Sequence, residues 1–222
     1  MAAMNRLRKN ISLLFVLSLL LIVGCKNDFD INNQKDFKVA INSVESGLTS
    51  KRQTKDLELS ATLIPAAYQA LTNYDHQDTT INLVEEELDY YSKSLSFTFK
   101  ITSIKAQSVN PIFERLNSYQ DYKNRVHDLN FRLEEMFHLD IGGERYPPAL
   151  FHFEGNQGFD REVRFNLVFS PSSAEDGLFY SGDQVKLVFK DNEFGTGIHQ
   201  FNFERESIKH FNEIDITQFL DL

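Results

Sequence analysis

Histidine and acidic side chains are the residues here that could support metal or acid–base chemistry, but their spacing does not favour it. None of the six histidines forms an HExxH motif or another close metal-binding pair. His138 and His152 could face each other across a hairpin that turns at Gly142-Gly143. Both occupy polar positions of alternating segments, which favours the outer face of a sheet. The acidic cluster Glu85-Glu86-Glu87 with Asp89 is typical of a solvated helix face, because a glycosidase would need two carboxylates converging in a cleft.

Loops rich in Asp, Asn and Gly could hold a cation or a phosphate. Asp191-Asn192-Glu193, which precedes Gly195, lacks the residue order of an EF-hand, and we expect a turn between two strands there. Glu175-Asp176-Gly177 is likewise expected to form a turn between two strands and not a cation site. Gly155-Asn156-Gln157-Gly158 lacks the GK[ST] ending of a phosphate loop, and the sequence contains no GxSxG nucleophile motif. The sequence therefore predicts no catalytic site, no metal site and no cofactor.

The N-terminus has the organisation of an export signal. Arg6, Arg8 and Lys9 precede an apolar run from Ile11 to Val23, interrupted only by two serines. This run is well short of the roughly 20 residues that a membrane-spanning helix needs. A short apolar core behind positive charge is typical of a cleaved signal peptide.

The residues that follow this run resemble the lipobox of bacterial lipoproteins. The resemblance covers residues 6–25 and rests on Ile22-Val23-Gly24-Cys25, in which Cys25 is the chain's single cysteine. It implies cleavage between Gly24 and Cys25 and attachment of palmitate-type acyl chains to Cys25. We therefore expect an exported protein anchored by lipid to the cell envelope, at the outer membrane if the organism is Gram-negative. The polar residues 25–35 predict a flexible tether behind the anchor.

Composition and length limit the function and the number of domains of the rest of the chain. The formal net charge is −9 before the basic signal segment is removed, which argues against nucleic-acid binding. Hydrophobic residues make up 41% of the sequence, enough for a buried core. The length after cleavage suits one β-rich domain over residues 36–222, and a split into two units near residues 105–112 is the alternative.

Apolar and polar residues alternate over much of this region, which indicates strands. We expect a mainly β fold, an antiparallel, immunoglobulin-like or related β-sandwich with one or two short helical insertions, and an α+β fold is the alternative. Helices are predicted at residues 66–72, 81–91 and 111–126, and residues 206–222 form either a helix or an irregular tail. The predicted strands lie in residues 37–41, 57–63, 95–101, 129–141, 146–153, 165–169, 185–189 and 201–203.

Tyrosines outside the predicted strand cores are candidates for an interface, because tyrosine offers a rigid contact area with a polar tip. The leading hypothesis is a non-enzymatic, lipid-anchored envelope protein that binds a protein partner or belongs to an envelope assembly. One alternative is capture of a small molecule or glycan at the cell surface, and another is a hydrolase. The candidate interface tyrosines are Tyr90, Tyr91, Tyr119, Tyr122, Tyr146 and Tyr180.

Overall fold

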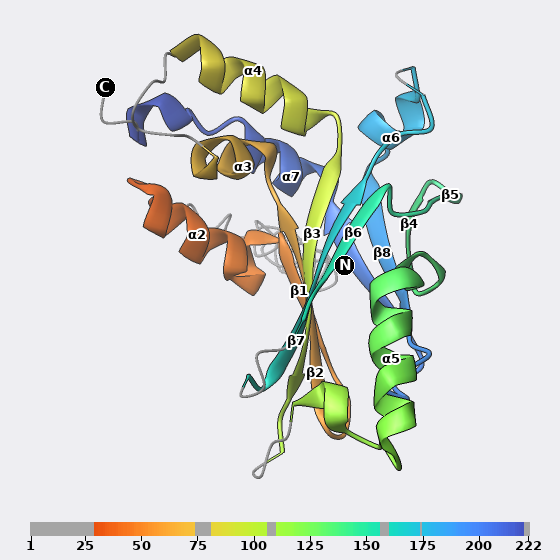
Figure 1. Cartoon of the computed structure of the whole chain (residues 1–222). Helices are drawn as coiled ribbons and strands as arrows, with labels where there is room; N and C mark the ends of the chain where they lie inside the picture. The colour runs from red at the N-terminus through yellow and green to blue at the C-terminus, as the bar shows by residue number, and fades with distance from the viewer. Residues whose placement is uncertain (1–28, 74–80, 106–109, 156–159, 174, 220–222) are drawn as a thin grey trace, which may run out of the picture.

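Two antiparallel sheets form the centre of the protein in the computed structural model, which describes residues 29–73, 81–105, 110–155, 160–173 and 175–219 (Figure 1). The five-stranded sheet has the order β1-β2-β3-β7-β6, and the four-stranded sheet has the order β5-β4-β8-β9. The strands are β1 (Thr49–Gln53), β2 (Leu57–Ile64), β3 (Leu95–Ser103), β4 (Phe137–Ile141), β5 (Glu144–Tyr146), β6 (Leu150–Glu154), β7 (Glu162–Phe169), β8 (Gln184–Lys190) and β9 (Ile198–Glu204).

Helices account for more of the chain than the sequence predicted. In Figure 1, α2, α3, α4 and α7 gather on one side of the strands, and α5 lies on the other. The arrangement is an α+β fold with two packed sheets; its immunoglobulin-like form stays a prediction. The α-helices are α2 (Gln34–Asn42), α3 (Ala66–Thr72), α4 (Ile81–Ser92), α5 (Tyr119–Phe131), α6 (Gly177–Ser181) and α7 (Arg205–Asn212). The 3₁₀ helices are η2 (Val44–Ser46), η3 (Pro111–Phe113), η4 (Leu133–Glu135) and η5 (Ile216–Phe219).

Phenylalanine side chains from both sheets form the core between them. The ring centroid of Phe99 on β3 lies 5.0 Å from that of Phe137 on β4 and 4.7 Å from that of Phe189 on β8. Phe97 meets Phe203 of β9 at 5.3 Å. These residues are fully buried. Since such aromatic pairs add about 0.5–1.5 kcal/mol beyond area burial, they fix how the two sheets face each other.

Several strand and helix predictions are confirmed. The alternating segments at 57–63, 95–101, 165–169, 185–189 and 201–203 fall in β2, β3, β7, β8 and β9. The predicted helices at 66–72 and 81–91 are α3 and α4. The predicted strand at 146–153 is interrupted, because β5 ends at Tyr146 and β6 begins at Leu150.

The strand predicted at residues 37–41 is wrong, because this segment lies in helix α2. The Asn33 side chain accepts a hydrogen bond from the Asp36 N–H and caps the helix. Phe37, Ala40 and Ile41 share the buried face. Val39, which the alternating pattern placed beside Phe37 and Ile41, is 64% exposed.

The long strand predicted at residues 129–141 is also wrong over its first half. Helix α5 continues to Phe131, η4 follows, and only β4 is a strand. Leu129 and Leu133 are buried as parts of the helical segments, while Phe131 is exposed. The helix predicted at 111–126 begins later than expected, at Tyr119, because Ser118 caps it there.

The predicted tether and domain split fall only partly on described residues, because residues 25–28 and 106–109 lie outside them. Cys25 and residues 26–28 lie outside the described residues, as does the signal segment. Phe29 and Ile31 pack partly buried against the core, so ordered structure begins before residue 36. On either side of residues 105–112, β3 and β7 are hydrogen-bonded neighbours from Leu95↔Phe169 to Thr102↔Glu162. In the described parts of the chain, every helix is too short or too polar to cross a membrane.

Candidate functional site

Three aromatic rings stack at one end of α5, and we call Phe113, Tyr119 and Tyr122 the aromatic ladder. The ring centroids of Phe113 and Tyr122 are 5.4 Å apart with planes 17° from parallel. Tyr119 and Tyr122 are 6.1 Å apart at 27°. Tyr119 is 76% exposed and Phe113 is 41% exposed. The ladder therefore presents flat aromatic surface to solvent.

Local backbone structure brings the three rings together. Ser118 caps α5 through the Asp121 N–H, which places Tyr119 at the first helical position and Tyr122 three residues later. Phe113 belongs to η3, where the Asn110 side chain accepts from the Ile112 N–H. Arg115 connects the two helices with a φ of 60°, a left-handed conformation that is uncommon for a residue other than glycine.

Arg125 fixes the helix that carries the ladder. Its buried guanidinium donates to the carbonyl oxygens of Ile112 at 3.0 Å, Glu114 at 2.7 Å and Glu193 at 2.8 Å. It also lies 5.4 Å from the ring centroid of Phe194. Burial raises the pKa of Glu193, and its 3.4 Å ion pair with Arg125 opposes that shift. Helix α5 is thereby tied to η3 and to the β8–β9 loop.

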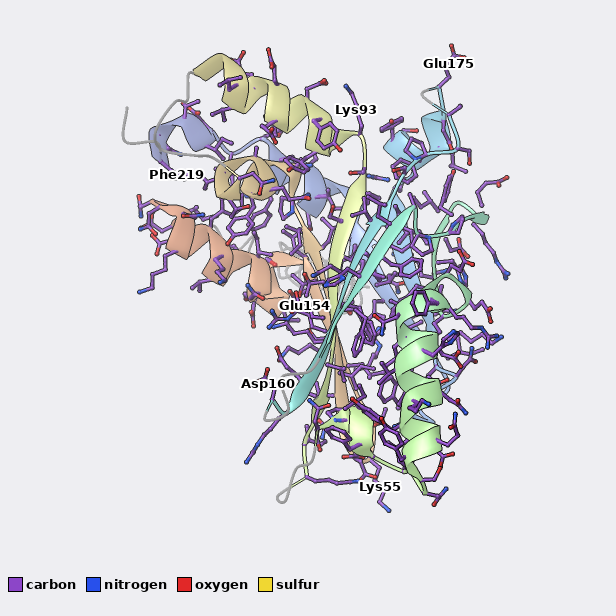
Figure 2. All side chains as sticks on the ribbon, in the orientation of Figure 1. Lys55, Lys93, Glu154, Asp160, Glu175 and Phe219 are labelled. Atoms are coloured by element: carbon purple, nitrogen blue, oxygen red, sulfur yellow. The ribbon has the colours of Figure 1, made fainter. Side chains whose placement is uncertain are left out.

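The other predicted interface tyrosines lie elsewhere. Tyr90 and Tyr91 meet edge to face at 5.2 Å near the end of α4, close to Lys93, which Figure 2 labels. They line a cavity of about 340 Å³ together with Leu150. Tyr180 lies on α6 and is partly exposed. The structure thus brings together Tyr119 with Tyr122 and Tyr90 with Tyr91.

Tyr146 requires a correction, because it is buried and does not belong to an exposed interface. Its ring contacts Phe179 edge to face at 5.2 Å, and its hydroxyl donates to Asp176 at 3.2 Å. Burial raises the pKa of Tyr146, and the hydrogen bond to Asp176 adds to the shift. It is the one buried residue of β5, a short edge strand that the sequence pattern did not resolve.

A polar cavity of about 370 Å³, which we call the outer groove, lies between α2 and the face of the five-stranded sheet that points away from the other sheet. Helices α2 and α3 supply Lys38, Asn42 and Tyr68, and the strands supply Thr98, Lys100, Glu154, Arg164 and Asn166. Glu154 is labelled in Figure 2. The volume falls within the range of small-molecule sites.

Ion pairs organise the floor of the outer groove. Arg164 donates to Glu154 at 3.1 Å and to Glu162 at 2.6 Å. Asn166 donates to the other oxygen of Glu154 at 2.8 Å. Lys100 lies 3.8 Å from Glu162, within ion-pair range but too far for a hydrogen bond. These contacts hold the charged side chains in place across neighbouring strands.

The histidines and acidic residues considered for chemistry are kept apart. His138 is on β4 opposite Val188, and His152 is on β6 opposite Asn166, so the two lie in different sheets. The predicted hairpin at Gly142-Gly143 is confirmed and joins β4 to β5, but it does not reach His152, so the predicted facing of the two histidines is wrong. Burial lowers the pKa of His138, with Arg145 adding to the shift.

The acidic loops have structural roles. The Asp191 carboxylate accepts from the N–H groups of Glu193 at 2.8 Å and Phe194 at 2.7 Å, which stabilises the predicted turn. Asp176 caps α6 through the Phe179 N–H. The cluster at 85–87 with Asp89 lies exposed on α4, as expected. Among the described residues, no group of three His, Cys, Asp or Glu side chains is placed to hold a metal ion.

The sequence pattern did not indicate some of the residues at these two sites. Phe113 lies six residues before Tyr119, and only the turn at Arg115 reveals that their rings belong to one surface. In the outer groove, Thr98 and Lys100 occupy the polar phase of β3, and Arg164 and Asn166 occupy that of β7. The sequence shows the alternation within each strand, but it does not show that β3 and β7 pair and so place these four residues on one face.

Comparison with known proteins gives only distant structural similarity. No protein-family model matches the chain, and no curated protein is similar to it. A protein of unknown function from Burkholderia pseudomallei is similar at 11% identity, with a TM-score of 0.38, covering 81% of this chain and 89% of that one. A DUF4426 family protein from Pseudomonas aeruginosa is similar at 10% identity, with a TM-score of 0.31, covering 71% and 93%.

Proposed function

We propose that this chain is a non-enzymatic lipoprotein of the cell envelope, exported and anchored through Cys25, that binds a protein partner through the aromatic ladder. The anchor rests on the signal segment and on Ile22-Val23-Gly24-Cys25. The binding role rests on one observation, the stacking of the exposed Phe113 and Tyr119 rings against the partly buried Tyr122. Large aromatic side chains are enriched at protein interfaces and dominate their energetics.

The rigidity of the ladder supports a binding role. Tyrosine loses little side-chain entropy on binding, and mutual stacking restricts these rings further. Arg125 holds the backbone beneath them through three carbonyl oxygens. A preorganised surface loses less free energy when a partner docks, so exposed stacked rings suit recognition better than scattered aromatic residues.

The ladder can be tested by in-membrane crosslinking followed by affinity purification. We expect Tyr119→Ala to reduce recovery of the crosslinked partner by at least about tenfold, because truncating an aromatic residue that anchors an interface costs about 2 kcal/mol or more. The matched control is Phe131→Ala, which removes a ring that is 68% exposed on the same helix but outside the ladder. Equal recovery from wild type and Tyr119→Ala would refute the ladder as the binding surface.

The anchor is tested separately. Replacing Cys25 with serine removes the thiol that would carry the lipid, so Cys25→Ser should abolish labelling with radioactive palmitate and leave the precursor uncleaved. The measurement is autoradiography of the immunoprecipitated chain beside an immunoblot of its size. Normal processing and labelling of this variant would show that the N-terminal segment is not a lipoprotein signal.

Capture of a small molecule or glycan at the cell surface is a second candidate function. The outer groove favours it, because a concave site combines the Tyr68 ring with fixed charged and amide side chains. The two functions use different surfaces, the ladder on α5 and the groove beside α2, so variants of one leave the other intact.

A further inference from the structure

The charges around the outer groove are unequal. Lys38, Lys100 and Arg164 line it, and Glu154 and Glu162 are the carboxylates that pair with Lys100 and Arg164. Both carboxylates are engaged by Arg164 through hydrogen bonds, while Lys100 contacts Glu162 only at 3.8 Å. Lys38 forms no ion pair with any residue in the described ranges. The groove therefore has a positive excess within an otherwise acidic chain.

A buried donor in the same groove is left without a partner. Among the described residues, Arg164 Nε is the buried side-chain nitrogen that no acceptor satisfies. Leaving such a donor unpaired is unfavourable, and more so when the group is charged. Its neighbours Glu154 and Glu162 already take the two terminal nitrogens of the guanidinium. Because Nε is covered, a bound molecule would meet Arg164 at its two terminal nitrogens, each of which keeps one N–H beyond the bond to its carboxylate.

Tyr68 adds a neutral donor to the wall of the groove. Burial raises the pKa of Tyr68, so its hydroxyl stays protonated at neutral pH. The ring is held edge to face against Phe37 at 5.4 Å, and Phe37 is fully buried. Cationic nitrogens, a fixed hydroxyl and the amide of Asn166 around one cavity are the groups that recognise an anionic molecule bearing hydroxyls.

We propose that the outer groove binds a small hydroxyl-bearing anion, a sugar acid or a sugar phosphate, with its anionic oxygens on the groove side of the Lys100 ammonium and the Arg164 guanidinium. This proposal rests on the second candidate function and names its ligand class. A carboxylate and a phosphate present the same chemistry to these nitrogens.

Isothermal titration calorimetry on the full processed chain in detergent tests the proposal with glucuronate, glucose 6-phosphate and glucose as probes. We expect at least one charged sugar to bind about tenfold more tightly than glucose, since hydrogen bonds between charged groups are stronger than those to neutral groups. Tighter binding of glucuronate assigns a sugar acid, and tighter binding of glucose 6-phosphate assigns a phosphorylated sugar.

Three variants locate the binding. Lys100→Gln removes one cation, and Arg164→Lys keeps the charge while removing the terminal guanidinium donors, so each should weaken binding of the charged probe about tenfold. Lys51→Gln is the control, because Lys51 pairs with Glu58 on the same sheet but does not line the groove. Thermal melts monitored by circular dichroism separate lost binding from lost folding.

The possible failures are distinguishable. Equal affinity for glucose and the charged sugars would overturn the anionic ligand class while leaving sugar capture standing. Absence of binding by all three probes would reject both the ligand class and sugar capture at this groove. Charged-sugar binding that survives Lys100→Gln and Arg164→Lys in folded protein would place the site elsewhere and overturn the proposal.

Discussion

Arg125 is a buried charge whose hydrogen bonds join three segments of the chain. Its guanidinium satisfies backbone carbonyls in η3, in the residue after it and in the β8–β9 loop. Those carbonyls would lose their donor if the side chain were truncated. At the residue scale, Arg125 satisfies backbone polar groups with a side chain, as a helix cap does. Its acceptors, however, belong to segments outside α5.

Arg125→Ala should lower the free energy of unfolding by about 3 kcal/mol, because several buried acceptors and the Glu193 carboxylate lose their partner. Arg125→Lys should recover only part of this loss, since one ammonium group cannot reach all three carbonyls. Urea denaturation followed by circular dichroism gives the values. Lys123→Ala, at an exposed position of the same helix, should change stability by less than about 0.5 kcal/mol. A similarly small change in Arg125→Ala would contradict the role assigned here.

At the scale of elements, α6 packs closely against the end of β4. A methyl group at Gly182 would lie 2.5 Å from Ile141 Cγ2 and 3.0 Å from the Leu178 carbonyl oxygen. The φ of Gly182 is −60°, which any residue adopts, so the constraint is space and not backbone conformation. Gly177, at the other end of α6, has no atom within 4 Å of such a methyl group.

Gly182→Ala should therefore destabilise the protein by about 1–3 kcal/mol through overpacking. Gly177→Ala should be neutral or stabilising by up to about 1 kcal/mol, because alanine favours the helix and meets open space. Thermal unfolding of the two variants in parallel measures the difference. Equal melting temperatures would mean that α6 does not pack against Ile141 as described.

The spacing of apolar residues explains which elements the sequence predicted correctly. Leu57, Leu59 and Leu63 are compatible with a strand and not with one helix face, and they form β2. Phe37 and Ile41 are four residues apart, as are Leu129, Leu133 and Phe137. A separation of four satisfies both the strand period and the helix period, so the pattern alone could not separate them. The caps at Asn33 and Ser118 decide in favour of helix.

At the scale of the whole molecule, the two halves of the chain share one sheet. β3 is hydrogen-bonded along its length to β2, which precedes it, and to β7, which follows it by about 60 residues. The Phe99 ring then contacts rings of β4, β8 and β9 across the core. Unfolding either half would expose the apolar face of the other.

We expect one cooperative unfolding transition for the whole described region. Urea melts followed by circular dichroism, which reports the helices and sheets, and by tyrosine fluorescence, which reports Tyr68, Tyr146 and the ladder, should have the same midpoint. Two separated transitions would instead support two units divided near residues 105–112.

The sequence by itself determined most of the alternating strands and indicated two of the three ladder residues, Tyr119 and Tyr122, while the export signal and the lipidation of Cys25 stay predictions from the sequence. These features are local, because a signal peptide, a strand face or an exposed tyrosine is encoded within a few neighbouring residues. Tertiary structure decided the helical identity of α2, the burial of Tyr146, the entry of Phe113 into the ladder and the existence of the outer groove. Each of these depends on contacts between distant segments, such as the pairing of Lys100 with Arg164 across β3 and β7, which no local spacing specifies.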